Sequence, residues 1–188
     1  MKQVALFGGS FDPPHMGHIF IVCYLALQNF DEILVLPSFK HPEGKNLSPF
    51  VHRLEMTKLA MDWIPSVTVS DFERKIATND KFNYTVDTVN KLLAEHADWR
   101  LHLVVGSDIS DFSRWERGDE LISKATPFIV GRAPATPGVH PILLPNISST
   151  EIRASLKKQL NHHIAKAYLP PNVLHYAETH NLYQPQRF

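Results

Sequence analysis

The sequence predicts an α/β fold, a doubly wound parallel sheet covered by helices on both faces. Two features carry this prediction. Short, continuously apolar runs recur along the chain, as expected for strands that are buried on both faces of a sheet. Longer segments with apolar residues at helical spacing separate these runs. A chain of 188 residues can bury such a sheet, and we expect residues 1–188 to form a single domain.

The first part of the chain sets the alternation of strand and helix. The first predicted strand, Val4–Phe7, ends at Gly8-Gly9, and the apolar segment Ile19–Leu27 is long enough for a helix. Glu32–Pro37 is the second predicted strand, and the polar segment Ser38–Ser48 that follows it is a predicted loop.

The second helix is predicted to begin at Ser48 and Pro49, which supply an N-cap and a first-turn proline. Its expected apolar face consists of Val51, Leu54, Met56, Leu59, Ala60 and Trp63. Val67–Ser70 is the third predicted strand. The charged segment Asp71–Phe82 that follows shows no period, and we expect it to be irregular.

The second half continues the alternation with shorter elements. A helix with Val86, Val89, Leu92 and Leu93 on its apolar face precedes the fourth predicted strand, Leu101–Val105. Further predicted elements are the strands Phe128–Val130 and Ile142–Leu144, a helix from the capping box Ser148–Glu151 to about Gln159, and a last helix from Asn172 to about His180. The whole pattern indicates a Rossmann-like sheet with a small C-terminal helical part.

Three polar or glycine-bearing segments directly follow predicted strands. They are Gly8-Gly9, Ser38–Lys45 and Gly106–Asp108. In a doubly wound sheet, ligands bind outside the carboxyl ends of the strands, near the point where the strand order reverses. We therefore expect these segments to converge on one edge of the sheet.

Composition excludes several classes of partner. Lysine plus arginine and aspartate plus glutamate each number 19, so the formal net charge of zero gives no general attraction for nucleic acid. No apolar run is long enough to cross a bilayer, and the N-terminal segment lacks a signal-peptide pattern. Cys23, the only cysteine, lies in an apolar helical run and is expected in the core. We expect a cytoplasmic protein with small-molecule substrates and neither nucleic-acid nor membrane partners. The sequence is compatible with a homo-oligomer and does not indicate its oligomeric state.

The start of the first helix has the features of an anion site. Gly8-Gly9 follows a strand, and His15 and His18, three positions apart, open a helix. Free backbone N–H groups, the positive end of the helix dipole and two imidazoles favour a phosphate there. A zinc pair would need a third ligand and often an HExxH pattern, which is absent, and two purely structural histidines are the other alternative.

A second candidate for phosphate binding lies far along the chain, in the segment Ile147–Arg153. The hydroxyls of Ser149 and Thr150, the first-turn N–H groups and Arg153 can together hold a polyphosphate. The alternative is an ordinary capping box beside a solvated arginine.

Taken together, Gly8–His18 and Ile147–Arg153 resemble the HxGH nucleotidylyltransferase superfamily. The segments Asn83–Thr88 and Gly106–Asp108, with Trp115 and an ending that runs from Tyr168-Leu-Pro-Pro to Tyr183, further resemble the bacterial nicotinate-nucleotide adenylyltransferases, nearly end to end. The resemblance implies a transferase of NAD biosynthesis that joins nicotinate mononucleotide to ATP. Its products would be nicotinate adenine dinucleotide and pyrophosphate.

The resemblance also implies roles for the ATP-side residues. His18 would steady charge at the α-phosphate, with His15 on the neighbouring phosphates. The departing β- and γ-phosphates would be held by Ser149, Thr150 and Arg153, and His15, His18 and Arg153 form the expected catalytic set. The other expected ATP-binding residues are Gly8, Gly9, Ser10 and Phe11, through backbone groups, and Gly106 and Asp108, beside the adenosine.

On the acceptor side, Thr85 and Trp115 would contact the acceptor, Trp115 by stacking on a pyridine ring. Lys40 or Lys45 would bind its phosphate. The resemblance implies Mg²⁺ bound through ATP phosphates, with no protein metal cage, and Asp12 is expected to brace its loop.

Two other interpretations keep the fold and change the function. One is a related nucleotidylyltransferase with nicotinamide mononucleotide or another phosphorylated acceptor, or with a cytidylyl donor. A pantetheine-phosphate enzyme is disfavoured because its Thr-Asn-Gly-His motif is replaced here by His-Met-Gly-His. The other is a non-catalytic nucleotide sensor, which the retention of both histidines and Arg153 disfavours.

Overall fold

A computed structural model describes residues 1–40, 44, 46–78, 82–132, 140–142, 147–157 and 162–184. Its strands are β1 (Lys2–Gly9), β2 (Glu32–Pro37), β3 (Val67–Val69), β4 (Trp99–Gly106), β5 (Ala125–Arg132) and β6 (His140–Ile142). Its α-helices are α1 (Met16–Ala26), α2 (Phe50–Met61), α3 (Phe72–Ile76), α4 (Thr85–Glu95), α5 (Gly118–Lys124), α6 (Ser149–Lys157), α7 (His162–Tyr168) and α8 (Pro171–Thr179). Short 3₁₀ turns, Ser107–Ile109 and Phe112–Arg114, follow β4.

The strands pair in parallel in the order β3-β2-β1-β4-β5-β6. Leu6 at the centre of β1 lies opposite Leu34 of β2 and Leu103 of β4. The chain builds the sheet outward from β1 in one direction and then returns to build it in the other, so the strand order reverses between β1 and β4. The doubly wound α/β prediction is confirmed.

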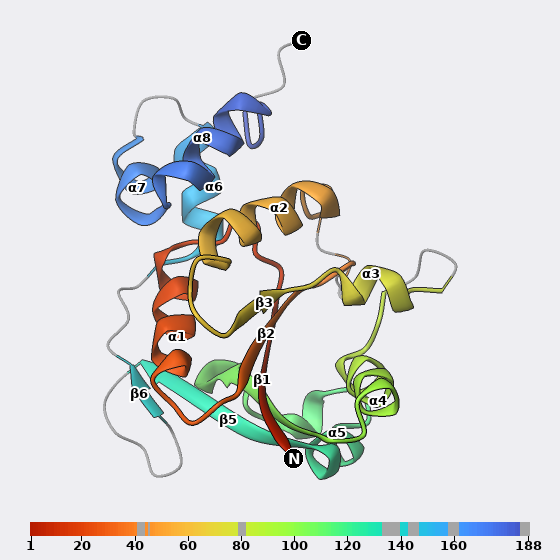
Figure 1. Ribbon diagram of the computed structural model, residues 1–188. Helices are drawn as coiled ribbons and strands as arrows, with labels where there is room; N and C mark the ends of the chain where they lie inside the picture. The colour runs from red at the N-terminus through yellow and green to blue at the C-terminus, as the bar shows by residue number, and fades with distance from the viewer. Residues whose placement is uncertain are drawn as a thin grey trace.

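Helices cover both faces of this sheet (Figure 1). One core packs α1 and α2 against alternate side chains of the central strands, among them Ala5 and Val35. The opposite core packs α3, α4 and α5 against the intervening side chains, among them Leu6 and Leu34. The apolar runs are continuous because both faces of each central strand are buried.

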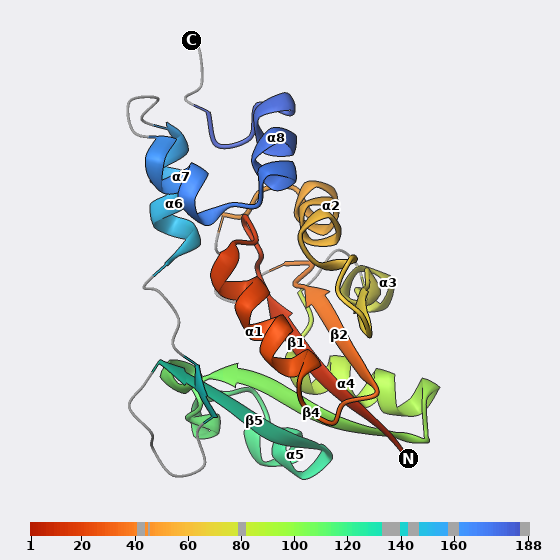
Figure 2. The ribbon, with the colours of Figure 1, turned by 60° about the vertical axis from the view of Figure 1, so that its left-hand side comes forward.

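The last three helices form the expected C-terminal helical part, which stands beyond one end of the sheet (Figure 2). Ile152 of α6 and Val173 of α8 are fully buried in the same core as α1 and α2. Asn172 also ties α8 to α2, because its side-chain amide donates to the Leu59 carbonyl at 2.7 Å. Cys23 packs half-buried against this core, as expected.

The predicted apolar face of α2 is partly wrong. Val51 and Trp63 are exposed, and the buried face instead includes Arg53. Ser48 does not cap this helix with its side chain, and Pro49 is the N-cap rather than the first helical residue. The Ser48 backbone is used elsewhere, since its N–H donates to Asp12 and its carbonyl accepts from Arg53.

Three short helices were not predicted, namely α3, α5 and α7. Each has seven residues or fewer, which is too short to establish a helical period in the sequence. Consequently α3 lies in the segment that we expected to be irregular. The last predicted strand is displaced, because β6 covers His140–Ile142, while 143 and 144 lie outside the described residues. In the described part of the chain no helix has the length and apolarity needed to span a membrane.

Candidate active site

The site begins where β1 ends and α1 starts. His15 is the N-cap residue of α1. Its backbone N–H donates to Nδ1 of His18 at 3.2 Å, and His18 thereby takes the place of the third helical residue in a capping box. The two imidazole rings stack with their centroids 3.8 Å apart and their planes 30° apart. The structure therefore brings the two histidines onto one face at a helix N-terminus.

The protonation of His18 follows from this arrangement. Burial lowers the pKa of the His18 imidazole well below its ordinary value, and the neighbouring His15 lowers it further. The ring is consequently neutral at pH 7, and Nδ1 is occupied as an acceptor of the His15 N–H. Its remaining nitrogen, Nε2, carries the proton and can donate a hydrogen bond to a phosphate oxygen.

Phe11 packs its ring against the His18 ring. Its backbone is in the left-handed region with φ of 47°, and its side chain is only 1% exposed. The Phe11 ring packs edge-on against Phe7 and His18, at centroid distances of 5.5 and 5.0 Å. Its aromatic side chain is thus part of the core, which leaves only its backbone groups for a ligand.

The first turn of α6 lies directly against the loop that leads into α1. The Ser149 hydroxyl donates to the Pro13 carbonyl at 3.0 Å, and Arg153 Nη1 donates to the Asp12 carbonyl at 2.6 Å. Arg153 Nη2 also donates to the Thr150 hydroxyl at 3.2 Å. Two motifs separated by more than 130 residues in the sequence therefore form one surface.

Ser148 opens α6 and makes one of the two bonds of the predicted capping box, the bond from the Glu151 N–H to its hydroxyl. Its hydroxyl accepts from the Glu151 N–H at 3.2 Å and donates to the Glu151 carboxylate at 3.0 Å. The ordinary capping role thus falls to Ser148 and Glu151, and the neighbouring Ser149 and Arg153 contact the other motif.

Asp12 braces the loop, as expected. Its side chain is 2% exposed; Oδ1 accepts from the Tyr183 hydroxyl at 2.6 Å and Oδ2 from the Ser48 N–H at 3.0 Å. The carboxylate therefore joins the end of the chain and the start of α2 to the loop that carries His15.

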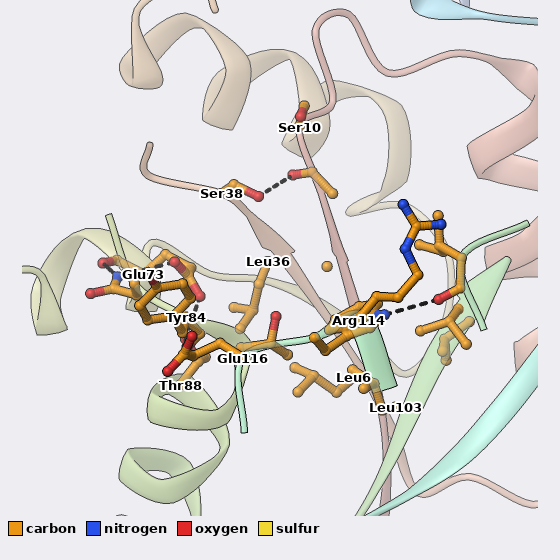
Figure 3. Close-up of a pocket in the computed structure, with 18 of the residues that line it drawn as sticks. Leu6, Ser10, Leu36, Ser38, Glu73, Tyr84, Thr88, Leu103, Arg114 and Glu116 are labelled. Carbon is orange, nitrogen blue, oxygen red and sulfur yellow. Dashed lines mark hydrogen bonds between the residues drawn. The ribbon is translucent and has the colours of Figure 1, made fainter. Parts of the chain in front are cut away.

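A cleft of about 690 Å³ opens at the carboxyl ends of β1, β2 and β4, at the reversal of strand order (Figure 3). The predicted residues that line it are Gly8, Gly9, Ser10, Lys40, Thr85, Asp108 and Trp115. The three post-strand segments converge here, through Gly8 and Gly9, Ser38 and Lys40, and Asp108. The cleft lining does not include the other predicted residues, which are Phe11, His15, His18, Gly106, Ser149, Thr150 and Arg153. Lys45 lies outside the described residues.

At one wall of the cleft, Gly106 makes room for Asp108. A Cβ on Gly106 would lie 2.3 Å from Oδ1 of Asp108, so the carboxylate folds back over the glycine. Trp115 is half-buried at the same wall, and its indole N–H donates to the Ile109 carbonyl at 3.0 Å. This bond fixes the indole beside the cleft, where one face can stack on a flat ligand.

Comparison with known proteins bears on the identity of this site. A family model described as cytidylyltransferase-like matches residues 6–155. Proteins named "Probable nicotinate-nucleotide adenylyltransferase" from Anaeromyxobacter sp. (strain K) and Myxococcus xanthus are 40% and 35% identical, covering 97% and 98% of this chain and 97% and 96% of their own. The chain belongs to the family of nicotinate-nucleotide adenylyltransferases, within the cytidylyltransferase-like group. The resemblance seen in the sequence is confirmed, and the protein is a nucleotidyltransferase enzyme.

The fold of the family is also recognised among solved structures. A nicotinic acid mononucleotide adenylyltransferase from Plasmodium falciparum, complexed with NaAD, matches with a TM-score of 0.82 at 23% identity, over 97% of this chain and 98% of that one. A nicotinate-nucleotide adenylyltransferase described as putative, from Vibrio parahaemolyticus, matches with a TM-score of 0.74 at 22% identity, over 97% and 96% of the two chains. These likenesses establish that the chain shares the fold of this nucleotidyltransferase family.

The sequence did not single out Glu73 of α3, which lies in the cleft wall beside Tyr84 and Thr88 (Figure 3). Its carboxylate accepts from the Thr88 hydroxyl, from the Asn83 amide at 3.0 Å and from the Phe39 N–H. Burial raises the pKa of Glu73 even though these donors oppose the shift. No local signal marks the residue, because its partners come from two other segments, the loop after β2 and Asn83–Thr88.

Arg53 of α2 was also missed, although one signal was available. It interrupts the apolar spacing of an otherwise amphipathic helix, and a charged residue on the inner face of a helix needs buried partners. The structure supplies them, because Arg53 is 1% exposed and donates to three main-chain carbonyls.

Proposed function

We propose that the chain transfers the adenylyl group of ATP to the phosphate of nicotinate mononucleotide, forming nicotinate adenine dinucleotide and pyrophosphate. One observation carries the proposal: the first turn of α6 is hydrogen-bonded to the loop that presents His15 and His18, beside a cleft at the strand-order reversal. The names of the relatives support the choice of substrates.

The reaction needs positioning and charge stabilisation more than acid–base chemistry. An oxygen of the acceptor phosphate, already anionic at neutral pH, attacks the α-phosphorus of ATP. The bond from that phosphorus to the oxygen bridging to the β-phosphate breaks, and the electron pair leaves with pyrophosphate. Because the nucleophile carries no proton that must be removed, no general base or covalent enzyme intermediate is required.

His18 is proposed to stabilise the α-phosphate as a hydrogen-bond donor. Its neutral ring, with Nδ1 accepting from the His15 backbone, directs Nε2–H outward to the charge that grows during attack. His15 would serve the neighbouring phosphates from the stacked ring.

The leaving pyrophosphate is assigned to the start of α6. Among the described residues Arg153 donates to the Asp12 carbonyl and the Thr150 hydroxyl. Its guanidinium carries five N–H groups, so it can also donate to phosphate oxygens. The Ser149 and Thr150 hydroxyls and the first-turn N–H groups would complete this half of the site.

The two substrates are proposed to meet in the cleft. Backbone groups from Gly8 to Phe11, with Gly106 and Asp108, would contact ATP. Lys40, Thr85 and Trp115 would contact the acceptor, Lys40 at its phosphate.

Mg²⁺ is proposed to enter with ATP. Among the described residues, no group of three or more histidine, cysteine, aspartate or glutamate side chains could hold a metal ion. The ion would be bound mainly by phosphate oxygens and water. When bound, the ion would neutralise phosphate charge.

The test is pyrophosphate release from ATP or CTP, with nicotinate mononucleotide, nicotinamide mononucleotide or phosphopantetheine as acceptor. We expect release with ATP and nicotinate mononucleotide to exceed every other pair. A preference for the nicotinamide acceptor or for CTP would replace the substrate and keep the reaction class. Absence of release with every pair would refute the proposed activity and favour a nucleotide sensor.

A further inference from the structure

The guanidinium of Arg53 connects three loops. Nη1 donates to the Ser10 carbonyl at 2.9 Å, Nη2 to the Phe39 carbonyl at 3.1 Å and Nε to the Ser48 carbonyl at 2.9 Å. The three acceptors belong to different segments: the loop after β1, the loop after β2 and the turn before α2. A single side chain on α2 therefore contacts all three segments at once.

Two of these loops carry opposite halves of the cleft. Ser10 belongs to the segment assigned to ATP, and Phe39 immediately precedes Lys40, assigned to the acceptor phosphate. The Phe39 peptide is held from both sides, with its carbonyl on Arg53 and its N–H on the Glu73 carboxylate. The neighbouring Ser38 is bonded to the Gly9 carbonyl through its own N–H at 2.8 Å and its hydroxyl at 3.2 Å.

We propose that Arg53 is a positioning residue that fixes the acceptor-side loop relative to the ATP-side loop, and so sets the distance between the attacking phosphate and the α-phosphorus. The inference rests on the proposed function for the identity of the two substrates. Arg53 is distinct from the residues assigned to the phosphates, because its side chain is only 1% exposed and its hydrogen bonds to described residues end on main-chain carbonyls.

The chemistry of the side chain explains why arginine stands at this position. Its planar fork points N–H groups in three fixed directions, whereas lysine offers three donors from one nitrogen. A lysine at position 53 could retain the positive charge and reach one or two of the carbonyls, but it cannot span all three. The interior location also excludes the water that would otherwise replace a lost bond.

The expected kinetic signature follows from the geometry. If Arg53 aligns two bound substrates, its replacement affects the alignment of the reacting atoms more than the affinity for either substrate. A misplacement of about 1 Å can cost about 100-fold in rate. We expect Arg53→Lys to lower kcat by roughly 10- to 100-fold and to change the dissociation constant of each substrate by less than about threefold.

The experiment compares wild type with Arg53→Lys and Arg53→Met. Pyrophosphate release gives kcat. Calorimetric titration with a non-hydrolysable ATP analogue and with nicotinate mononucleotide gives each affinity, and the analogue titration also counts the sites that can bind. The matched control is Thr57→Val, one turn further along α2, where a fully buried hydroxyl donates to the Arg53 carbonyl at 2.7 Å. Thermal unfolding measures the destabilisation of each variant, and the kinetic assays are run at a temperature at which all of them are folded.

A fall in kcat per competent site for Arg53→Lys, with affinities retained and Thr57→Val unaffected, supports the inference. A kcat within twofold of wild type overturns it, as does a loss confined to the affinity for one substrate. Hydrogen–deuterium exchange gives a readout that needs no turnover: faster exchange in the peptides that contain Ser10 and Phe39 is expected for both Arg53 variants and absent in Thr57→Val. Unchanged exchange in these peptides also overturns the inference. If wild type itself releases no pyrophosphate, the proposed function fails, and the exchange experiment still decides whether Arg53 joins the loops.

Discussion

The bond between Tyr183 and Asp12 gives a quantitative test of how the end of the chain supports the active-site loop. The Tyr183 hydroxyl donates to Asp12 Oδ1 at 2.6 Å, across 171 positions of sequence. Burial and the neighbouring Asp12 charge raise the pKa of the Tyr183 phenol, so the hydroxyl stays protonated and remains a donor at neutral pH. Tyr183→Phe removes this donor and leaves the aromatic ring in place.

The size of the effect follows from the burial of the acceptor. A hydrogen bond to a charged group contributes about 1.5–3 kcal/mol. Asp12 is 2% exposed, but Tyr183 is only half-buried, so water can approach the vacated position and the lower end applies. We expect Tyr183→Phe to lower the free energy of unfolding by about 1.5 kcal/mol. For a domain of this size, the Tm should fall by about 3–6 °C.

Urea unfolding and scanning calorimetry measure this change, with Tyr176→Phe as the control. The Tyr176 hydroxyl lies 3.0 Å from Nδ1 of His52, and both groups are half-buried. Its hydrogen-bond partner is an imidazole rather than a carboxylate, so its loss should cost less than about 1 kcal/mol. A double-mutant cycle with Asp12→Asn should give a coupling energy above about 0.5 kcal/mol. The reasoning is refuted if Tyr183→Phe is no more destabilised than Tyr176→Phe, or if the cycle shows no coupling.

Two further predictions concern the ATP side of the site. Gly106→Ala should weaken the binding of an ATP analogue roughly tenfold in a calorimetric titration, because the new Cβ displaces Asp108. The free energy of unfolding should hardly change, because φ at Gly106 is −68°, which alanine adopts without strain. Asp108→Ala should cause the same loss of affinity, and the double variant should show no additional loss. For His18 the folded pKa lies below the unfolded value of 6.5, so the unfolded chain binds more protons as the pH falls below about 6.5 and stability decreases there. Replacing the ring by His18→Gln, which keeps a capping side chain, should reduce the loss of unfolding free energy between pH 7.5 and 5.5 by up to about 1 kcal/mol in urea titrations. Identical pH profiles for the two proteins would contradict the assigned environment of His18.

Local sequence determined the central strands and the two helix starts that are proposed to bind phosphate. Val4–Phe7 and Glu32–Pro37 are continuously apolar because both faces of a central parallel strand are buried, and this requirement is visible within a few residues. The same holds for the capping box at Ser148 and Glu151, whose partners lie three positions apart. These features depend on backbone geometry over one or two turns, so the sequence alone predicted them.

The tertiary structure alone decided how these parts are joined. Arg53 and Glu73 are held by partners 5 to 43 positions away, and the contact of Arg153 with Asp12 crosses 141 positions. A short-range pattern cannot specify such contacts. The acceptors for Arg53 and Arg153 are main-chain carbonyls, which every residue type carries, and the donors for Glu73 come from segments remote from α3. Their positions become defined only when the sheet brings the carboxyl ends of β1 and β2 to one edge. The residue types at the start of α1 and at the start of α6 are therefore visible in short stretches of sequence. The distance between these two helix starts is set only by the packing of the folded chain.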